Sequence, residues 1–294
     1  MGGQLRQIKR RIGSVQSTKK ITRAMELIAS SRIVKATQAV GAARPYAQEM
    51  RRMLGSVAQN AGSLDSPLLK ERDEVRVVGS IVIAADRGLA GPYNSNILRA
   101  AERDLQSHEK EPKLYLAGKK TISYFRFRGY DVSDSWQGFS DRPSISDART
   151  IAGKVVSDFL EGRVDEVHLA FTRFESAMTQ RPVVLRLVPL PREEFQEGEK
   201  EGASASYLFE PSPEQILELL LPRYVEGTIF QAMLEAAASE HAARRRAMKA
   251  ATDNADELIE NLTRVYNQAR QAEITTEIME IVGGAEALAQ QRKE

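Results

Sequence analysis

One stretch near the end of the chain decides the fold: residues 223–282, RYVEGTIFQAMLEAAASEHAARRRAMKAATDNADELIENLTRVYNQARQAEITTEIMEIV. It contains no proline and a single glycine, Gly227, and it is dominated by Ala, Glu, Arg, Leu and Gln. These residues favour helices, and a helix of this length would run for about 90 Å at about 1.5 Å per residue. Most globular helices have about 8–20 residues, so the stretch predicts a coiled coil or a helical shaft.

The start of the chain predicts a second long helix, because no proline lies between Gln4 and Arg44 and apolar residues recur at nearly heptad spacing. Residues 1–58 contain 12 Lys and Arg against two acidic residues, a net charge of +10, whereas residues 214–294 have a net charge of −5. We therefore expect the two terminal helices to pair with each other. The apolar stripe of the first helix consists of Leu5, Ile8, Ile12, Val15, Ile21, Met25 and Ile28. Small residues that would let a partner helix approach the second are Ala232, Ala236, Ala243, Ala247 and Ala250.

Between the two ends the pattern changes to strands that alternate with helices, which predicts an α/β domain with a largely parallel sheet. A linker rich in Glu, Gly, Ser and Pro, residues 191–213, leads back into the long helix. The expected strands are 75–86, 113–118, 165–174 and 182–190, and the expected helices are 93–106, 119–127 and 144–160.

The composition excludes several classes of protein. The chain has 294 residues, of which 28% are charged and 42% apolar, the ordinary range for a globular protein. It has no cysteine, so a disulfide, a thiolate zinc site and an iron–sulfur cluster are excluded. The strongest apolar run, residues 77–85, is strand-sized and shorter than the roughly 18 residues of a membrane helix. The basic N-terminus lacks an apolar segment, and we interpret it as mature protein.

Two segments contain glycines in positions that partly match phosphate-binding loops. Residues 86–94, DRGLAGPYN, follow the first strand, but their two glycines lie three apart and Pro92 lacks an amide donor, so a structural turn is expected. Residues 118–121, GKKT, depart from the phosphate-loop pattern and predict the start of a surface helix.

The histidines and the acidic pair at the third strand suggest no catalytic or metal site. His108, His168 and His241 are far apart in sequence without a second ligand at metal spacing. Asp165 and Glu166 are interpreted as the polar start of a strand. No catalytic residue, metal or cofactor is therefore predicted.

The basic N-terminal helix leaves one alternative function open, a nucleic-acid-binding coiled coil. No aromatic residue, on which bases could stack, lies between Met1 and Arg44, which argues against this reading. An independent nucleotide-using enzyme is a second alternative, which the weak phosphate motifs disfavour. The apolar residues 281–289 near the C-terminus predict a protein contact.

Three long segments together resemble the gamma subunits of F-type ATP synthases: IGSVQSTKKITRAMELIASSRIVKA (12–36), AADRGLAGPYNSN (84–96) and EHAARRRAMKAATDNADELIENLTRVYNQARQAEITTEIMEIVGGAEAL (240–288). The resemblance implies a long antiparallel coiled coil of the N- and C-terminal helices plus a Rossmann-like α/β middle domain that binds no nucleotide. The domains would be residues 1–60, the N-terminal coiled-coil helix, residues 61–213, the Rossmann-like domain with its linker, and residues 214–294, the C-terminal coiled-coil helix.

The resemblance also implies a function, that of the central rotor shaft. Ion-driven rotation of the membrane c-ring would turn the shaft and drive the beta-subunit sites through ATP synthesis or hydrolysis, so this chain itself would be non-catalytic and carry no cofactor. Its partners would be three alpha and three beta subunits, the epsilon subunit and the c-ring, with no nucleic acid. It would lie peripherally on the cytoplasmic side of the cell inner (plasma) membrane of a bacterium, touching the membrane only through the complex.

The same resemblance assigns partner-binding residues. Met25 would lie near an acidic lever loop of beta, with Arg244 in the region that acts with it, and Arg32 and Lys35 would make charged contacts with acidic loops of beta. Tyr207 would belong to the foot of the shaft, and the tail from Ile281 onward would sit in an apolar sleeve. The upper-shaft residues that would meet catch loops of the surrounding subunits are Arg270, Gln271, Thr275, Glu277 and Glu280.

Overall fold

The computed structural model describes residues 2–60, 66–108, 110–191 and 212–291. The chain divides into two compact units, residues 29–244 and residues 1–28 with 245–294. Two long helices, α1 (Gly2–Asn60) and α6 (Pro213–Gln291), contribute residues to both units. The division into domains 1–60, 61–213 and 214–294 stays a prediction.

The unit formed by residues 29–244 contains a five-stranded sheet in the order β3-β2-β1-β4-β5. β1 pairs in parallel with β2 and β4, β2 pairs in parallel with β3, and the edge strand β5 runs antiparallel to β4. The predicted parallel α/β arrangement is confirmed. The sequence analysis missed β3, whose segment VSDSW is short and half polar and lies at a sheet edge. The strands are β1 (Val77–Ile83), β2 (Glu111–Ala117), β3 (Val132–Trp136), β4 (Glu166–Phe174) and β5 (Gln180–Val188).

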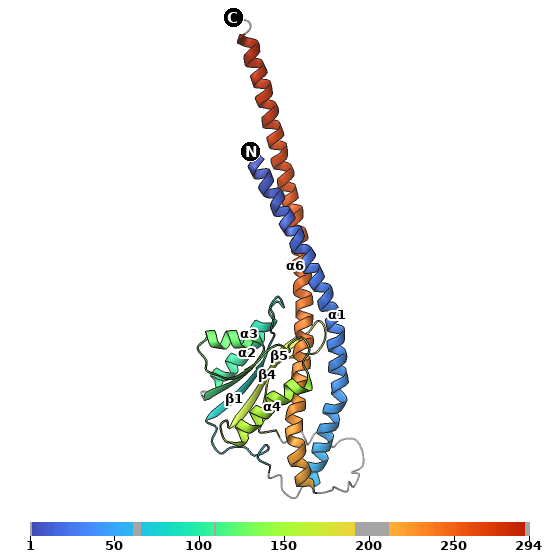
Figure 1. Cartoon of the computed structure of the whole chain (residues 1–294), viewed down its shortest axis with the longest axis vertical. Helices are drawn as coiled ribbons and strands as arrows, with labels where there is room; N and C mark the ends of the chain where they lie inside the picture. The colour runs from blue at the N-terminus through green and yellow to red at the C-terminus, as the bar shows by residue number, and fades with distance from the viewer. Residues whose placement is uncertain (1, 61–65, 109, 192–211, 292–294) are drawn as a thin grey trace. The chain divides into compact units, whose positions relative to one another are not determined.

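Helices cover both faces of the sheet (Figure 1). On one face, α2 (Tyr93–Ser107) and α3 (Lys119–Phe127) bury residues such as Ile97 and Phe125 against the strands. On the other face, α4 (Ile145–Leu160) packs together with residues of α1 and α6. A capping box between Ser144 and Asp147 fixes the start of α4.

One buried carboxylate ties α4 to the sheet. Asp158 of α4 is fully buried, and the hydroxyl of Tyr115 on β2 donates to it at 2.6 Å. Lys113, Lys154 and Arg163 surround the same carboxylate within 3.0 Å. Burial alone would raise the pKa of Asp158, but these hydrogen bonds outweigh burial and hold the pKa well below its ordinary value. The carboxylate is therefore charged and fully paired.

The part of α6 from Ile229 to Arg244 is enclosed, since none of its residues is exposed. Ala232 and Ala236 belong to a cluster that contains Met50 and Leu54 of α1 as well as sheet residues, whereas Ala238 and Ala242 cluster with Ile33 and Val40 of α1. The enclosed alanines of α6 therefore lie against α1, as predicted, and Ala232 and Ala236 also lie against the α/β domain. Ala250, also assigned to that face, is exposed.

Apolar residues in the described helices do not form a run long enough to cross a bilayer.

Candidate functional site on the two long helices

Residues 1–28 and 245–294 form an antiparallel pair of helices. Thr22 of α1 lies opposite Thr252 of α6, and Lys19 lies opposite Asp256, so the position on one helix falls as the other rises. This confirms the predicted pairing of the termini. Spacings of three and four residues relate the buried and half-buried side chains, as in a coiled-coil seam. Those with this spacing are, in α1, Leu5, Ile8, Ile12, Val15, Lys19, Thr22 and Glu26 and, in α6, Met248, Thr252, Ala255, Ile259, Leu262, Tyr266 and Ala269; Met25, Ala247, Ala251, Glu273 and Thr276 are half-buried as well.

The seam contains a polar layer that the sequence analysis did not find. The hydroxyls of Thr22 and Thr252 lie 2.8 Å apart in a buried hydrogen bond, and Glu26, only 8% exposed, accepts from Arg23 at 2.8 Å. The predicted stripe placed Ile21 and Ile28 in the seam, and this is wrong, because their exposed fractions are 61% and 53%. A spacing of three and four residues from Val15 leads to Lys19, Thr22 and Glu26 instead. Polar residues in a seam fix the register of the two helices.

α6 extends past the N-terminal end of α1 and continues there as a single helix. Extrapolating from the Thr22–Thr252 contact, Gly2 at the start of α1 lies opposite about residue 272 of α6. From Glu277 to Ala285 every residue of α6 is exposed. This segment and the turn before it carry a run of exposed apolar side chains, Ile274, Ile278, Met279, Ile281 and Val282, whose exposed fractions lie between 46% and 72%. An apolar surface of this size marks a protein contact.

The five predicted upper-shaft residues lie along this part of α6, and all of them are exposed. The structure therefore leaves their side chains accessible to a partner, and their contacts stay a prediction. They are Arg270, Gln271, Thr275, Glu277 and Glu280.

Arg244 lies in the other unit and is nearly buried, with 9% of its side chain exposed. Its guanidinium donates to Glu240 at 2.6 Å and to the carbonyl of Gly88, in the glycine turn, at 3.1 Å. Burial raises the pKa of Glu240 despite the neighbouring Arg244. Burial also lowers the pKa of His241, which keeps this imidazole neutral near pH 7. Within its own unit, Arg244 thus fastens α6 to the α/β domain.

The other predicted contact residues differ in accessibility. Arg32 of α1 is half-buried and forms an ion pair with Asp141 at 2.7 Å, whereas Lys35 is exposed. Met25 is half-buried and lies in the unit of the helix pair. Tyr207 lies outside the described residues. The role of each toward a partner stays a prediction.

The glycine turn lies at the carboxyl edge of the sheet, where doubly wound folds bind nucleotides. Here the polar side chains of the turn are used internally. The carboxylate of Asp86 accepts from the backbone N–H groups of Lys119 at 2.9 Å, Gly138 at 2.9 Å and Ser140 at 3.2 Å. The side chain of Asn94 accepts from the amide of Ala85 at 3.0 Å. The structure supports the interpretation of this segment as a structural turn.

Helix α6 covers the same edge of the sheet. Ser239 donates to the carbonyl of Thr172 on β4 at 3.1 Å, and the hydroxyl of Tyr93, at the start of α2, donates to the carbonyl of Ala236 at 3.1 Å. Tyr93 and Ala243 also share a buried cluster with Ala85 and Ala90. The crevice between β1 and β4, where the strand order reverses, is thus filled by a helix of the same chain.

Comparison with known proteins identifies the family. The family model described as ATP synthase matches residues 4–288. The ATP synthase gamma chain of Kineococcus radiotolerans is 52% identical over 297 residues, covering 98% of this chain and 98% of that protein. This chain belongs to the ATP synthase gamma family. Another gamma chain, from Mycolicibacterium smegmatis, is 49% identical over 306 residues, covering 98% of this chain and 99% of that protein.

Solved structures share the fold of this gamma-family chain. One from the Euglena gracilis mitochondrial ATP synthase, in an assembly of OSCP, F1 and c-ring, has a TM-score of 0.68 at 17% identity and covers 100% of this chain and 97% of that chain. Another, from the Tetrahymena thermophila mitochondrial central stalk and c-ring, has a TM-score of 0.60 at 24% identity, covering 79% and 99%. The α/β middle domain with long terminal helices is therefore a gamma-family fold.

Three residues of the α/β domain, Asp104, His108 and His168, could hold a metal ion. The sequence analysis treated the histidines as far apart, but the fold brings His108 and His168 together, with ring centroids 4.7 Å apart. Asp104 contacts both rings, and His108, the C-cap of α2, follows it by four residues. The expected helix, 93–106, ended before His108, so the four-residue spacing gave no clear signal. The approach of His168 depends on the packing of α2 against β4, which no local pattern reveals.

Proposed function

We propose that this chain is the central rotor shaft of a bacterial F-type ATP synthase and couples ion-driven rotation of a c-ring to the catalytic cycle of beta subunits. The observation that carries the proposal is the antiparallel pair of terminal helices in a gamma-family chain, with an apolar single-helix extension of α6 beyond the end of α1. A pair of helices locked in register resists twisting. An extension with an exposed apolar surface suits a part that must turn.

The polar layer supports separate roles for the paired helices, which would resist twisting, and for the extension, which would turn against its surroundings. The Thr22–Thr252 hydrogen bond and the Lys19–Asp256 ion pair favour one register of the two helices, because a slip would break both contacts. The apolar contacts of the extension are non-directional and cost little to exchange during rotation. Torque would pass through the paired section, and the extension would serve as a bearing.

The chain itself is proposed to be non-catalytic, with ATP chemistry carried out by the beta subunits. The filled crevice supports this, because the Asp86 carboxylate occupies the edge with bonds from the amides of Lys119 and Gly138, and α6 covers the switch point. We infer that the isolated chain shows no saturable ATP binding at micromolar concentrations. Binding of ATP that a Gly91→Val substitution abolishes would contradict this part.

The proposed partners are three alpha and three beta subunits around the helices, and an epsilon subunit and the c-ring at the foot. The chain would lie peripherally on the cytoplasmic face of the plasma membrane. Residues 1–60 and 214–294 would form the shaft, and residues 61–213 would form the foot with Tyr207. The exposed residues Lys35 and Glu277 are among the proposed contacts, together with Met25, Arg32, Arg244, Arg270, Gln271, Thr275 and Glu280.

The experiment is co-expression with alpha, epsilon and tagged beta subunits, followed by ion-driven ATP synthesis and ATP hydrolysis in membrane vesicles. We expect this chain to copurify with beta. Lys35→Glu should lower the ratio of synthesis to hydrolysis, because repulsion from acidic loops replaces attraction, whereas Lys35→Gln should lower it less. Surface charge contacts of this kind contribute roughly 0–1 kcal/mol each.

Lys35 is a cleaner probe than Arg32, whose substitution would also break its ion pair with Asp141. A truncation after Gly284 should retain assembly and most coupling, because the extension would lose length but keep its axis. Failure to copurify with beta would overturn the rotor proposal. An unchanged ratio in Lys35→Glu would overturn only the charged contact.

A further inference from the structure

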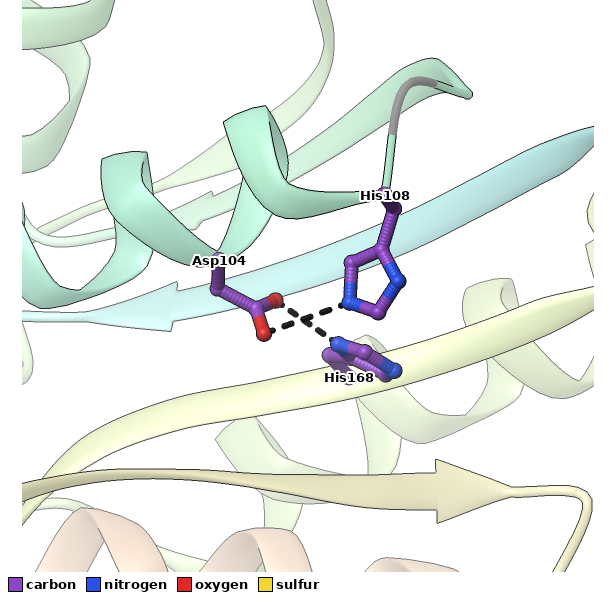
Figure 2. Close-up of side chains that lie close together, drawn as sticks. All are labelled: Asp104, His108 and His168. Carbon is purple, nitrogen blue, oxygen red and sulfur yellow. Dashed lines mark hydrogen bonds and ion pairs between the residues drawn. The ribbon is translucent and has the colours of Figure 1, made fainter.

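Two histidines and a carboxylate cluster where α2 covers one face of the sheet (Figure 2). Asp104 comes from the last turn of α2, His108 is the C-cap of that helix, and His168 comes from β4. Nδ1 of His168 lies 2.7 Å from Oδ2 of Asp104, and Nε2 of His108 lies 3.4 Å from Oδ1 of the same carboxylate. One ligand atom from each of these residues lies within 4.8 Å of the others.

The fourth residue, Glu166, stands behind His168. Its Oε1 lies 2.7 Å from Nε2 of His168, where it accepts a hydrogen bond from an N–H on that nitrogen and so holds Nδ1 toward Asp104. A carboxylate that holds the outer N–H of an imidazole is the usual support of a metal-ligating histidine, because it fixes the ring and raises its basicity.

The electrostatics of the cluster favour a cation. The side chain of His168 is only 8% exposed and lies between two carboxylates. The C-terminal end of α2 adds a negative potential. Arg186, beside His168 across the β4–β5 ladder, is paired with Glu71 at 3.0 Å.

We propose that Asp104, His108 and His168 bind a divalent transition-metal ion, best matched by zinc, with Glu166 as the residue that orients His168. Two imidazole nitrogens and one carboxylate oxygen are a common zinc ligand set, whereas magnesium and calcium prefer oxygen ligands. Ligand atoms around tetrahedral zinc lie about 3.4 Å apart, and the three candidate ligand atoms here lie within 4.8 Å of one another, so an ion would draw the side chains closer. His108 has 36% of its side chain exposed, which leaves the fourth position open to water.

Such a site would fasten the end of α2 to β4 within the α/β domain. It lies outside the residues assigned to the rotor shaft and does not depend on the proposed function. The ion would take the place that a proton holds between Nδ1 of His168 and Asp104 when the site is empty.

The test is titration of untagged, metal-free full-length chain with zinc chloride by calorimetry, with magnesium chloride as the reference. We expect zinc to bind at one ion per chain and to raise the melting temperature, and magnesium to do neither. His108→Ala should weaken zinc binding at least tenfold, and Glu166→Gln should weaken it by about 10–100-fold. Gln106→Ala, at an exposed position on the same helix, is the control and should bind like the unmodified chain.

Circular dichroism of each variant without metal should match that of the unmodified chain, because His108 is half-exposed and leaves the His168 cluster intact. X-ray absorption at the zinc edge should report two imidazole ligands, and one in His108→Ala. Absence of saturable zinc binding to the folded chain would overturn the proposal. Equal zinc affinity in His108→Ala and in the unmodified chain would overturn it as well.

Discussion

Two stretches of the same helix, α6, have opposite surroundings. From Ile229 to Arg244 no residue is exposed, and the helix contacts the α/β domain and α1 within its unit. From Glu277 to Ala285 every residue is exposed. Tertiary packing specifies the first stretch, whereas local propensity holds the second, because an isolated helix gains nothing from burial. The same type of residue should therefore have very different energetic roles in the two stretches.

Substitutions in the two stretches should therefore affect different properties, the stability of the chain in one and partner binding in the other. Substitutions in the enclosed stretch should unfold the chain, and the same substitutions in the exposed stretch should leave it folded and alter only contacts with other subunits. Matched substitutions at the two places test this separation directly.

Among the matched substitutions, glutamate to alanine should give the largest difference in stability between the two stretches. Glu240 is 1% exposed and holds the guanidinium of Arg244, so Glu240→Ala leaves a buried charge without its carboxylate and should destabilise the chain by about 3–5 kcal/mol. The matched variant Glu277→Ala should change stability by less than about 0.5 kcal/mol. Urea denaturation followed by circular dichroism measures both. Equal midpoints for the two variants would show that the Glu240–Arg244 pair does not hold α6 in place.

Isoleucine gives the apolar version of the same comparison. Ile229 is fully buried in the main core, and Ile229→Ala should cost about 2–5 kcal/mol through lost burial and a cavity. Ile278 is 54% exposed, and Ile278→Ala should leave the stability of the isolated chain nearly unchanged. Thermal unfolding of the isolated chain measures the first effect, and retention on tagged beta reports any effect of the second. A large loss of stability in Ile278→Ala would show that this face is already covered within the chain.

Low pH should destabilise the α/β domain, because Asp158 becomes protonated. Because its pKa is depressed in the folded state, its contribution to stability is present above the ordinary Asp pKa of about 3.9 and is lost as the pH falls below that value. Asp158→Asn should cost about 2 kcal/mol near pH 7, where charged hydrogen bonds are lost, and less near pH 3. Denaturant midpoints measured from pH 7 to pH 3 give the two curves. Parallel curves for the variant and the unmodified chain would argue against this carboxylate as a source of acid sensitivity.

The smallest effect should come from the polar layer of the paired section. Thr22→Val alone removes one buried hydroxyl from the Thr22–Thr252 bond and should cost about 1 kcal/mol. The double variant Thr22→Val, Thr252→Val should recover most of that loss, because no hydroxyl is left without its partner across the seam. A double-mutant cycle by urea denaturation measures the coupling. Additive losses would mean that the two hydroxyls do not act as a pair.

Much of the fold could be predicted from local patterns. The helix at 93–106 and the strand at 165–174 differ from the observed α2 and β4 by one residue each, because amphipathic and β-branched segments of ordinary length carry strong local signals. The short polar strand β3 was missed because neither its composition nor its length separates it from a loop. The seam was misplaced at Ile21 and Ile28 because apolar character was taken as the sign of burial, whereas the structure buries Thr22 and Glu26 there.

By itself, the sequence determined the two long helices, their pairing through opposite charge, the α/β domain between them and, through extended similarity, the family. These features depend on periodicity, composition and long runs of matching residues, all of which are local or additive along the chain. Only the tertiary structure decided which face of α6 meets the sheet, that Arg244 is buried against Gly88, and that His168 lies beside Asp104 and His108. Each of these is a contact between residues far apart in sequence, and its geometry depends on how whole elements pack against one another.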